Sequence, residues 1–295
     1  MNDMSPATTT SEAAARLQER TDRSMNDMSA PLSAVSAGKR RRFRHIFRAD
    51  GRAVFVAMDH PSYMGMGVEP AAAAAIAAGG PDAVLATWQL ARARPEAFAG
   101  AGLVLRIDGG ISSLGDPPAA DTTSLLYSAE QAMVLGADAV VIMVFPGTPD
   151  EQHSLGRLAR LAAECELLGL PVMAESIPGG WPRTVPWTAE NVGRGARLAV
   201  ELGADIVKTM CPGPPEEFAP VAEACPAPVV ALGGPKIDDE DQVVALARGV
   251  VEAGGAGVAF GRNVWGSEDP AALVGRLLEA VHGAGGGVAE GKEHR

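Results

Sequence analysis

The chain has 295 residues and a formal net charge of -11, from 25 basic and 36 acidic side chains. This charge would repel a phosphate backbone, so nucleic acid is not an expected partner. Its three cysteines show no paired metal-ligand spacing, and no apolar run reaches the ~20 residues that cross a bilayer. With 47% hydrophobic and 21% charged residues, the composition is that of a globular protein. We therefore expect a cytoplasmic protein with no membrane partner.

The two ends of the chain differ in composition from the rest. Residues 1–38 lack a periodic apolar face over most of their length and contain a near-duplication, MNDMSPA and then MNDMSAP, which predicts a disordered tail. The duplicate also leaves Met25 open as an alternative start. The basic cluster from Lys39 to Arg42, with Arg44, is interpreted as a solvated run. A single catalytic domain is predicted over 39–285 and a flexible tail over 286–295.

From Ala53 onward, short apolar runs alternate with longer helix-like stretches, as in parallel β/α units. The eight runs are AVFVAMD, AVLATW, GLVLRIDGG, AVVIMVFPG, PVMAES, DIVKTM, PVVALGG and GVAFGRN. Helices are predicted between them, over 124–135, 151–168, 189–202, 240–253 and 270–282. Several helices end on a recurring phrase (LGAD, LGLP or AGGAG) in which glycine supplies the left-handed cap. Eight units predict a single (β/α)8 TIM barrel with a disordered N-terminal extension, because an open sheet would leave two edges exposed.

A doubly wound nucleotide-binding fold is the competing prediction, since the same alternation builds it. No GxGxxG phrase follows the first predicted strand. The first junction reads MDHPSYMGMG, whose Asp59, His60 and Tyr63 suit contact with a substrate better than a pyrophosphate cradle. The barrel is therefore the favoured fold.

Reactive side chains in such a barrel lie at the C-terminal ends of the strands. The polar residues at those positions are Asp59 and His60 after the first run, Arg106 and Asp108 in the third, Glu175 and Ser176 in the fifth, Lys208 in the sixth and Lys236 after the seventh.

Lys208 lies within ADIVKTM, a predicted strand whose composition otherwise favours burial. A buried lysine is costly, and alternation along the strand places its side chain in the barrel mouth if it points inward. Two interpretations stay open: an ion pair with a neighbouring carboxylate, or a desolvated nucleophilic amine. A second cation, Lys236, would favour the uncharged amine, although it would serve equally to cap its loop or bind phosphate.

The last two runs end in Gly233-Gly234-Pro235 and Gly261-Arg262-Asn263. Loop amides at these positions of a barrel often bind phosphate, and an arginine adds a charge-assisted fork. Tight turns are the alternative explanation for the glycines. The predicted substrate and phosphate contacts are His60, Arg106, Gly233, Gly234, Lys236, Gly261 and Arg262.

Five phrases, in order, carry a family resemblance: FRADGRAVFVAMDH, GADAVVIMVFPGT, LGADIVKTMCPG, PVVALGGPKIDDED and AGGAGVAFGRNVWGSEDP. Over about 44–282 the chain resembles the archaeal-type class I fructose-bisphosphate aldolase family and related deoxyribose-phosphate-aldolase-like barrels. The resemblance implies a metal-independent aldolase without a cofactor that forms or cleaves a carbon–carbon bond of a small phosphorylated keto substrate, and a homo-oligomer. It further implies that Lys208 forms the Schiff base, that Asp59 is the active-site acid, and that GGPK and GRN bind phosphate.

Two phrases depart from the family pattern. Members carry Trp-Ser-Tyr-Pro in the fifth strand, where the Tyr relays a proton, but this chain reads Glu175-Ser176-Ile177-Pro178. The expected replacement is Glu175, whose carboxyl burial near an iminium can tune toward neutral pH, or Tyr63; a counter-ion role for Glu175 is the alternative. In the third strand, Lys-x-Asn-Gly-Lys is replaced by Arg106-Ile107-Asp108-Gly109-Gly110.

These departures make a specialised biosynthetic reaction at least as well supported as sugar-bisphosphate cleavage. An acyl or transaldol-type transferase or isomerase that uses Lys208 is one alternative, and a non-catalytic sugar-phosphate-binding barrel is another.

Overall fold

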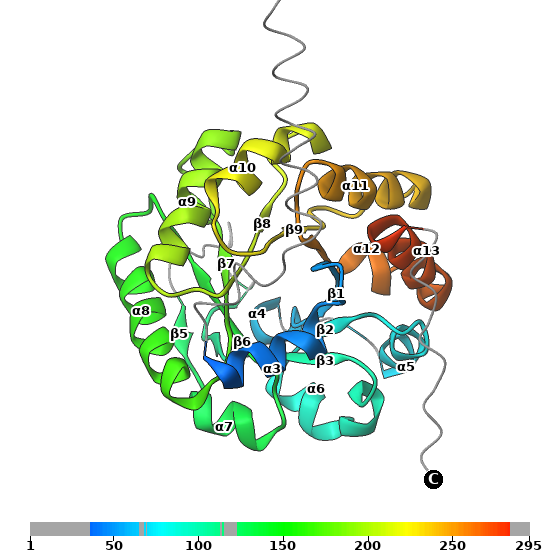
Figure 1. Ribbon diagram of the computed structural model, residues 1–295, viewed down its shortest axis with the longest axis horizontal. Coiled ribbons are helices and arrows are strands. Elements are labelled where there is room, and N and C mark those ends of the chain that lie inside the picture. Colours follow the sequence, from blue (N-terminus) through cyan, green and yellow to red (C-terminus); the bar gives the residue numbers. More distant parts are fainter. Residues whose placement is uncertain (1–35, 65–67, 69, 113, 115–122, 284–295) are drawn as a thin grey trace, which may run out of the picture.

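Eight parallel strands close into a barrel in the computed structural model, which describes residues 36–283 except 65–67, 69, 113 and 115–122 (Figure 1). In the barrel each strand pairs with the strands before and after it, and β10 pairs with β1. The predicted (β/α)8 barrel is confirmed. The strands are β1 (Ala53–Met58), β2 (Ala83–Ala86), β3 (Gly102–Arg106), β6 (Ala139–Val144), β7 (Val172–Ser176), β8 (Ile206–Met210), β9 (Val229–Leu232) and β10 (Gly257–Phe260).

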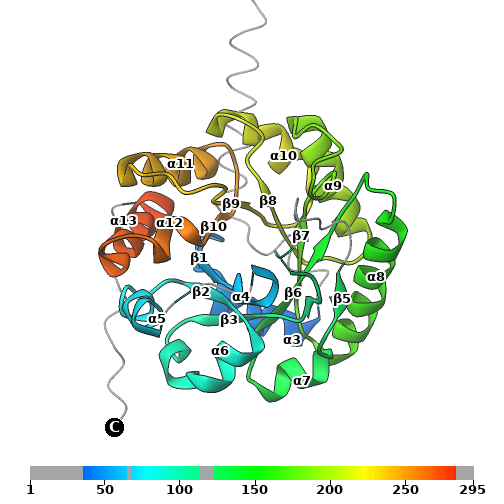
Figure 2. The same ribbon diagram turned by 180° about the vertical axis from the view of Figure 1, so that it is seen from behind.

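Helices surround the strands, as both views show (Figure 2). None of the described helices is long and apolar enough to cross a membrane. They are α4 (Pro61–Met64), α5 (Pro70–Ala78), α6 (Trp88–Ala93), α7 (Ala129–Val134), α8 (Glu151–Leu168), α9 (Ala189–Glu201), α10 (Ala219–Ala224), α11 (Glu240–Glu252), α12 (Arg262–Trp265) and α13 (Pro270–His282), with 3-10 turns η1 (Pro95–Phe98) and η2 (Pro215–Phe218).

The helix predicted over 124–135 is wrong in its first part. Ser124–Leu125 form strand β5, which pairs antiparallel with β4 (Asp108–Gly109). Helix α7 begins only after Ser128, whose side chain forms a capping box with Gln131. Tyr127 therefore lies before the helix, where its ring stacks on Trp88 with the centroids 4.3 Å apart.

Helix α3 (Ala37–Ile46) was not predicted, and it begins inside the segment assigned to the tail. The rest of that segment and the C-terminal tail lie outside the described residues. Phe43, Ile46 and Phe47 pack with side chains of the barrel interior such as Phe55. Figure 1 shows α3 in front of the strands, so this helix closes the N-terminal end of the barrel.

Three aspartates at the N-terminal end of the barrel tie neighbouring strands together. Asp82, Asp138 and Asp205 directly precede β2, β6 and β8. Each carboxylate accepts a hydrogen bond from a backbone amide near the start of the preceding barrel strand, at 2.7, 3.0 and 2.9 Å. The aspartate of the LGAD phrase thus has a structural role beside that of the glycine cap.

The same aspartates attract the basic side chains of α3 and of the loop that follows it. Arg48 pairs with Asp82, His45 with Asp138, and Lys39 with Asp205. Lys39 is 2% exposed and also contacts Glu166 at 2.7 Å. The interpretation of Lys39 as part of a solvated run is wrong, because strand-start carboxylates offer this cation buried partners.

His282 fastens the end of α13 to the N-terminal end of the barrel. Its Nδ1 lies 2.7 Å from Asp50 Oδ2 and its Nε2 lies 2.9 Å from Asp82 Oδ2. Burial lowers the pKa of His282, but the two carboxylates outweigh it and raise the pKa above its ordinary value.

We expect the contribution of His282 to the free energy of unfolding to be complete below its unfolded pKa of ~6.5. The contribution is lost as pH rises through the raised pKa of the folded state. His282→Asn should therefore lower the melting temperature more at about pH 6 than at about pH 9. Thermal unfolding of both proteins across this pH range is the measurement. A difference in melting temperature that does not depend on pH would contradict a stabilising role for the charged His282 side chain.

Candidate active site

Lys208 and Glu175 lie side by side at the C-terminal end of the barrel. They occupy paired positions on β8 and β7, so both side chains point to the same face. Lys208 Nζ lies 2.9 Å from Glu175 Oε1, and the two residues are 3% and 5% exposed. Of the two interpretations of Lys208, the ion pair is present in this arrangement. It does not exclude the nucleophile, because Glu175 is placed to take the lysine's proton.

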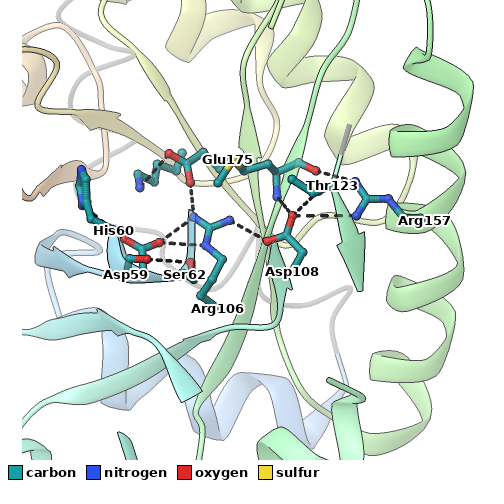
Figure 3. A network of polar contacts seen from close by, with 10 residues as sticks. Asp59, His60, Ser62, Arg106, Asp108, Thr123, Arg157 and Glu175 are labelled. Carbon is teal, nitrogen blue, oxygen red and sulfur yellow. Dashed lines mark hydrogen bonds and ion pairs between the residues drawn. The ribbon is translucent and has the colours of Figure 1, made fainter. Parts of the chain in front are cut away.

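Arg106 is the centre of a buried cluster of carboxylates (Figure 3). Its Nε and Nη2 donate to Asp59 Oδ2 at 2.9 and 2.7 Å, and its Nη1 donates to Asp108 Oδ1 at 3.0 Å. Nη2 also donates to Glu175 Oε2. Arg106 is only 1% exposed. This placement does not favour Arg106 as a phosphate contact, because protein carboxylates already engage its donors.

Asp59 presents one carboxylate oxygen to Arg106 and leaves the other without a hydrogen-bond partner. Oδ1 is buried and unpaired within the described part of the chain. Burial raises the pKa of Asp59, but the charges of Arg106 and Lys208 outweigh it and hold the pKa at about 2. Asp59 is therefore a carboxylate at neutral pH that accepts hydrogen bonds and does not donate a proton. A buried unpaired acceptor is costly, which suits it to a substrate hydroxyl.

Glu175 is ionised for a related reason. Burial raises the pKa of its carboxyl, but Lys208 and Arg106 oppose burial and bring the pKa below its ordinary value. The expectation that burial near an iminium tunes Glu175 toward neutral pH stays a prediction, because in this substrate-free arrangement two cations, Lys208 and Arg106, face the carboxylate. In this state Glu175 can act only as a base.

His60 and Tyr63 follow Asp59 in the chain. His60 Nδ1 lies 4.0 Å from Asp59 Oδ1, and its ring meets Trp265 edge to face, with the centroids 5.8 Å apart. Burial lowers the pKa of His60 further than the charge of Asp59 raises it, so the imidazole is neutral at pH 7. Tyr63 belongs to α4, and its side chain lies outside the described residues.

The two glycine-containing loops after β9 and β10 lie together, as the sequence predicts. Arg262 Nη2 donates to the carbonyl of Gly234 at 2.9 Å, and Gly234 has a φ of +62°. At Gly261 a Cβ would lie 2.9 Å from both the Ala57 carbonyl oxygen and His60 Cε1, so only glycine fits. Lys236 and Arg262 are exposed beside these loops.

Asn263 joins the two loops. It is 1% exposed, its Nδ2 donates to the Gly233 carbonyl at 2.9 Å, and its Oδ1 accepts from Ile237 N at 2.8 Å. In the sequence, this residue stands out only as part of the GRN phrase. Both ends of one amide are therefore used to fix the geometry of the predicted phosphate site.

Sequence reasoning also missed the partners of Asp108. Thr123 and Arg157 approach this carboxylate from the loop before β5 and from α8. A lone arginine on a predicted helix and a threonine in a loop give no signal of a shared buried site, since both types are usually solvated.

A buried lysine beside a carboxylate, in the mouth of a (β/α)8 barrel, defines a class of enzyme that binds carbonyl substrates as imines. The model of the DeoC/LacD family aldolases matches residues 53–267, well over half of the chain. The chain belongs to this family and is a class I aldolase.

Three relatives place it more finely. The 2-amino-4,5-dihydroxy-6-oxo-7-(phosphonooxy)heptanoate synthase of Streptomyces griseus is 34% identical, over 68% of this chain and 73% of the relative. The class 1 fructose-bisphosphate aldolase of Thermoproteus tenax is 31% identical over 82% of this chain and 94% of its own length. A solved archaeal fructose-1,6-bisphosphate aldolase with its catalytic lysine bound to a carbinolamine intermediate has a TM-score of 0.71 and 29% identity, and covers 83% of this chain and 100% of that one.

Proposed function

We propose that Lys208 forms an imine with the ketone of a small phosphorylated donor, and that the enzyme joins this donor to an aldehyde. The observation that carries the proposal is the buried contact of 2.9 Å between Lys208 Nζ and Glu175 Oε1. A carboxylate at this distance removes the lysine's proton when a carbonyl carbon is presented to the amine.

The reaction follows from these positions. The proton of the Lys208 ammonium passes to Glu175, and the free amine attacks the ketone carbon to give a carbinolamine. Glu175 returns the proton to the hydroxyl, which leaves as water and yields an iminium. Glu175, again a carboxylate, takes a proton from the adjacent carbon and gives an enamine, whose carbon attacks the aldehyde carbon and forms the new bond. Glu175 returns this proton to the alkoxide, and water then hydrolyses the iminium and releases the product from Lys208.

Asp59 and the glycine-containing loops would hold the donor during these steps. The unpaired Oδ1 of Asp59 accepts a hydrogen bond from a donor hydroxyl. Lys236 and Arg262, with the loop amides after β9 and β10, bind the phosphate. His60, neutral and next to Asp59, is a further substrate contact. Tyr63 remains the second candidate for proton transfer.

The name of the Streptomyces griseus relative suggests the substrates. Its product is a β-hydroxy ketone with the phosphate next to the ketone. Reversing an aldol addition between the carbons numbered 4 and 5 in that name gives dihydroxyacetone phosphate and a four-carbon amino-acid aldehyde. We infer that this chain uses the same donor in a specialised aldol condensation, which the departure of its fifth strand from the sugar-bisphosphate pattern favours.

Borohydride trapping tests the proposal. The full chain is incubated with dihydroxyacetone phosphate and sodium borohydride, digested, and mapped by mass spectrometry. We expect one donor-dependent adduct, on Lys208. The same mixture with aspartate semialdehyde or glyceraldehyde 3-phosphate, and without borohydride, shows which acceptor is extended. Turnover of the donor without an adduct on Lys208 would contradict the imine route.

We also infer a homo-oligomer, as in the family, and a cytoplasmic location. Light scattering of the purified chain measures the first, and cell fractionation the second. A monomer at micromolar concentration would contradict the assembly.

A further inference from the structure

Asp108 binds Arg106 on the side opposite Asp59. It is 0% exposed and its Oδ1 accepts from Arg106 Nη1 at 3.0 Å. Its Oδ2 accepts from Thr123 Oγ1 at 2.6 Å and from Met143 N at 2.9 Å, and Arg157 Nη1 lies 4.0 Å away. Figure 3 shows Asp108 on the far side of Arg106 from Asp59.

Asp108 is held rigidly by three separate parts of the fold. Strand β4 pairs with β5, which fixes the backbone of Asp108 against Leu125. The amide of Met143 belongs to β6, and Arg157 belongs to α8. A carboxylate fixed in this way presents its other oxygen, Oδ1, to Arg106.

Arg106 connects Asp108 to the side chains proposed to react. It donates to Asp59 and to Glu175, and Glu175 contacts Lys208. Arg106 is the side chain that links Asp108 to Glu175 and, through Glu175, to Lys208. A guanidinium is a planar fork, so fixing Nη1 also fixes the directions of Nε and Nη2.

Building on the proposed imine route, we propose that Asp108 is a positioning residue. Its hydrogen bond to Arg106 orients the carboxylates of Asp59 and Glu175, and Glu175 in turn holds Lys208.

The test compares Asp108→Asn with the wild type in two assays. The first is the rate of borohydride trapping of dihydroxyacetone phosphate on Lys208 at one fixed pH. We expect this rate to fall at least about threefold, because Arg106 no longer holds Glu175 in place beside Lys208. The second is steady-state turnover, in which we expect kcat to fall at least about tenfold while KM for the donor changes less than about threefold, since the phosphate loops are untouched.

Asp138→Asn is the matched control. Asp138 precedes β6, at the opposite end of the barrel, and pairs with His45. This variant makes the same chemical change and should lower stability without changing the trapping rate or kcat. If Asp108→Asn does not fold, Thr123→Val removes one hydrogen bond to Asp108 Oδ2 and should lower kcat about threefold at unchanged KM.

The outcomes separate the two proposals. Failure to trap the wild type on Lys208 removes the imine route itself. A wild type that is trapped, with Asp108→Asn showing the same trapping rate and the same kcat, overturns only the role of Asp108. A loss of rate of equal size in Asp138→Asn would also overturn it, because it would show a general effect of losing a buried carboxylate.

Discussion

Replacing Lys208 by methionine is expected to reduce kcat by roughly 10⁴-fold or more, because no other amine replaces the covalent step. Methionine keeps an unbranched chain of similar length and removes the charge, so Glu175 keeps its contact with Arg106. The phosphate loops are unchanged, so binding of dihydroxyacetone phosphate, measured by calorimetry, should weaken by no more than about tenfold. Turnover is measured with the acceptor that the trapping experiment selects.

Lys39→Met is the matched control for that variant. Lys39 is buried as deeply as Lys208, at 2% against 3% exposed, and also pairs with a carboxylate. It lies at the opposite end of the barrel, so its loss should lower the melting temperature and leave kcat unchanged. If Lys208→Met retains wild-type turnover, or if both variants lose activity equally while folded, Lys208 is not the nucleophile.

Replacing Glu175 by glutamine is expected to lower kcat by roughly 10²- to 10⁴-fold, the usual contribution of a general acid–base group. The amide keeps the shape of the carboxyl group but cannot take the proton of Lys208. Imine formation should be slower and not abolished, because water can accept that proton. Borohydride trapping over time separates the two effects, since the final yield of adduct on Lys208 should equal that of the wild type.

Asp205→Asn is the corresponding control. Asp205 directly precedes β8, the strand that carries Lys208, and its contact with Lys39 repeats the contact of Glu175 with Lys208 at the other end. Loss of this charge should reduce stability and spare turnover. An unchanged kcat in Glu175→Gln would exclude Glu175 from proton transfer and make Tyr63→Phe the next variant.

Most of the barrel could be predicted because its signal is local. Each of the eight apolar runs is a strand, and glycine ends helices because it adopts the left-handed backbone that a side chain resists. Helix α3 could not be predicted in the same way. Its basic run looks solvated in the sequence, and Asp205, the buried partner of Lys39, lies far away along the chain. The first residue of α7 was predicted wrongly for a related reason. The pairing of β5 with β4 is a contact between separate segments of the chain.

The sequence by itself determined the fold class, the family and the place of Lys208 in a buried strand. Period-two alternation and the order of the phrases depend only on neighbours along the chain. Only the tertiary structure decided how the charges are shared. Arg106 looked like a contact for phosphate, but the folded chain surrounds it with Asp59, Asp108 and Glu175. Ionisation depends on distances between strands and on burial, so it emerges only when the barrel closes.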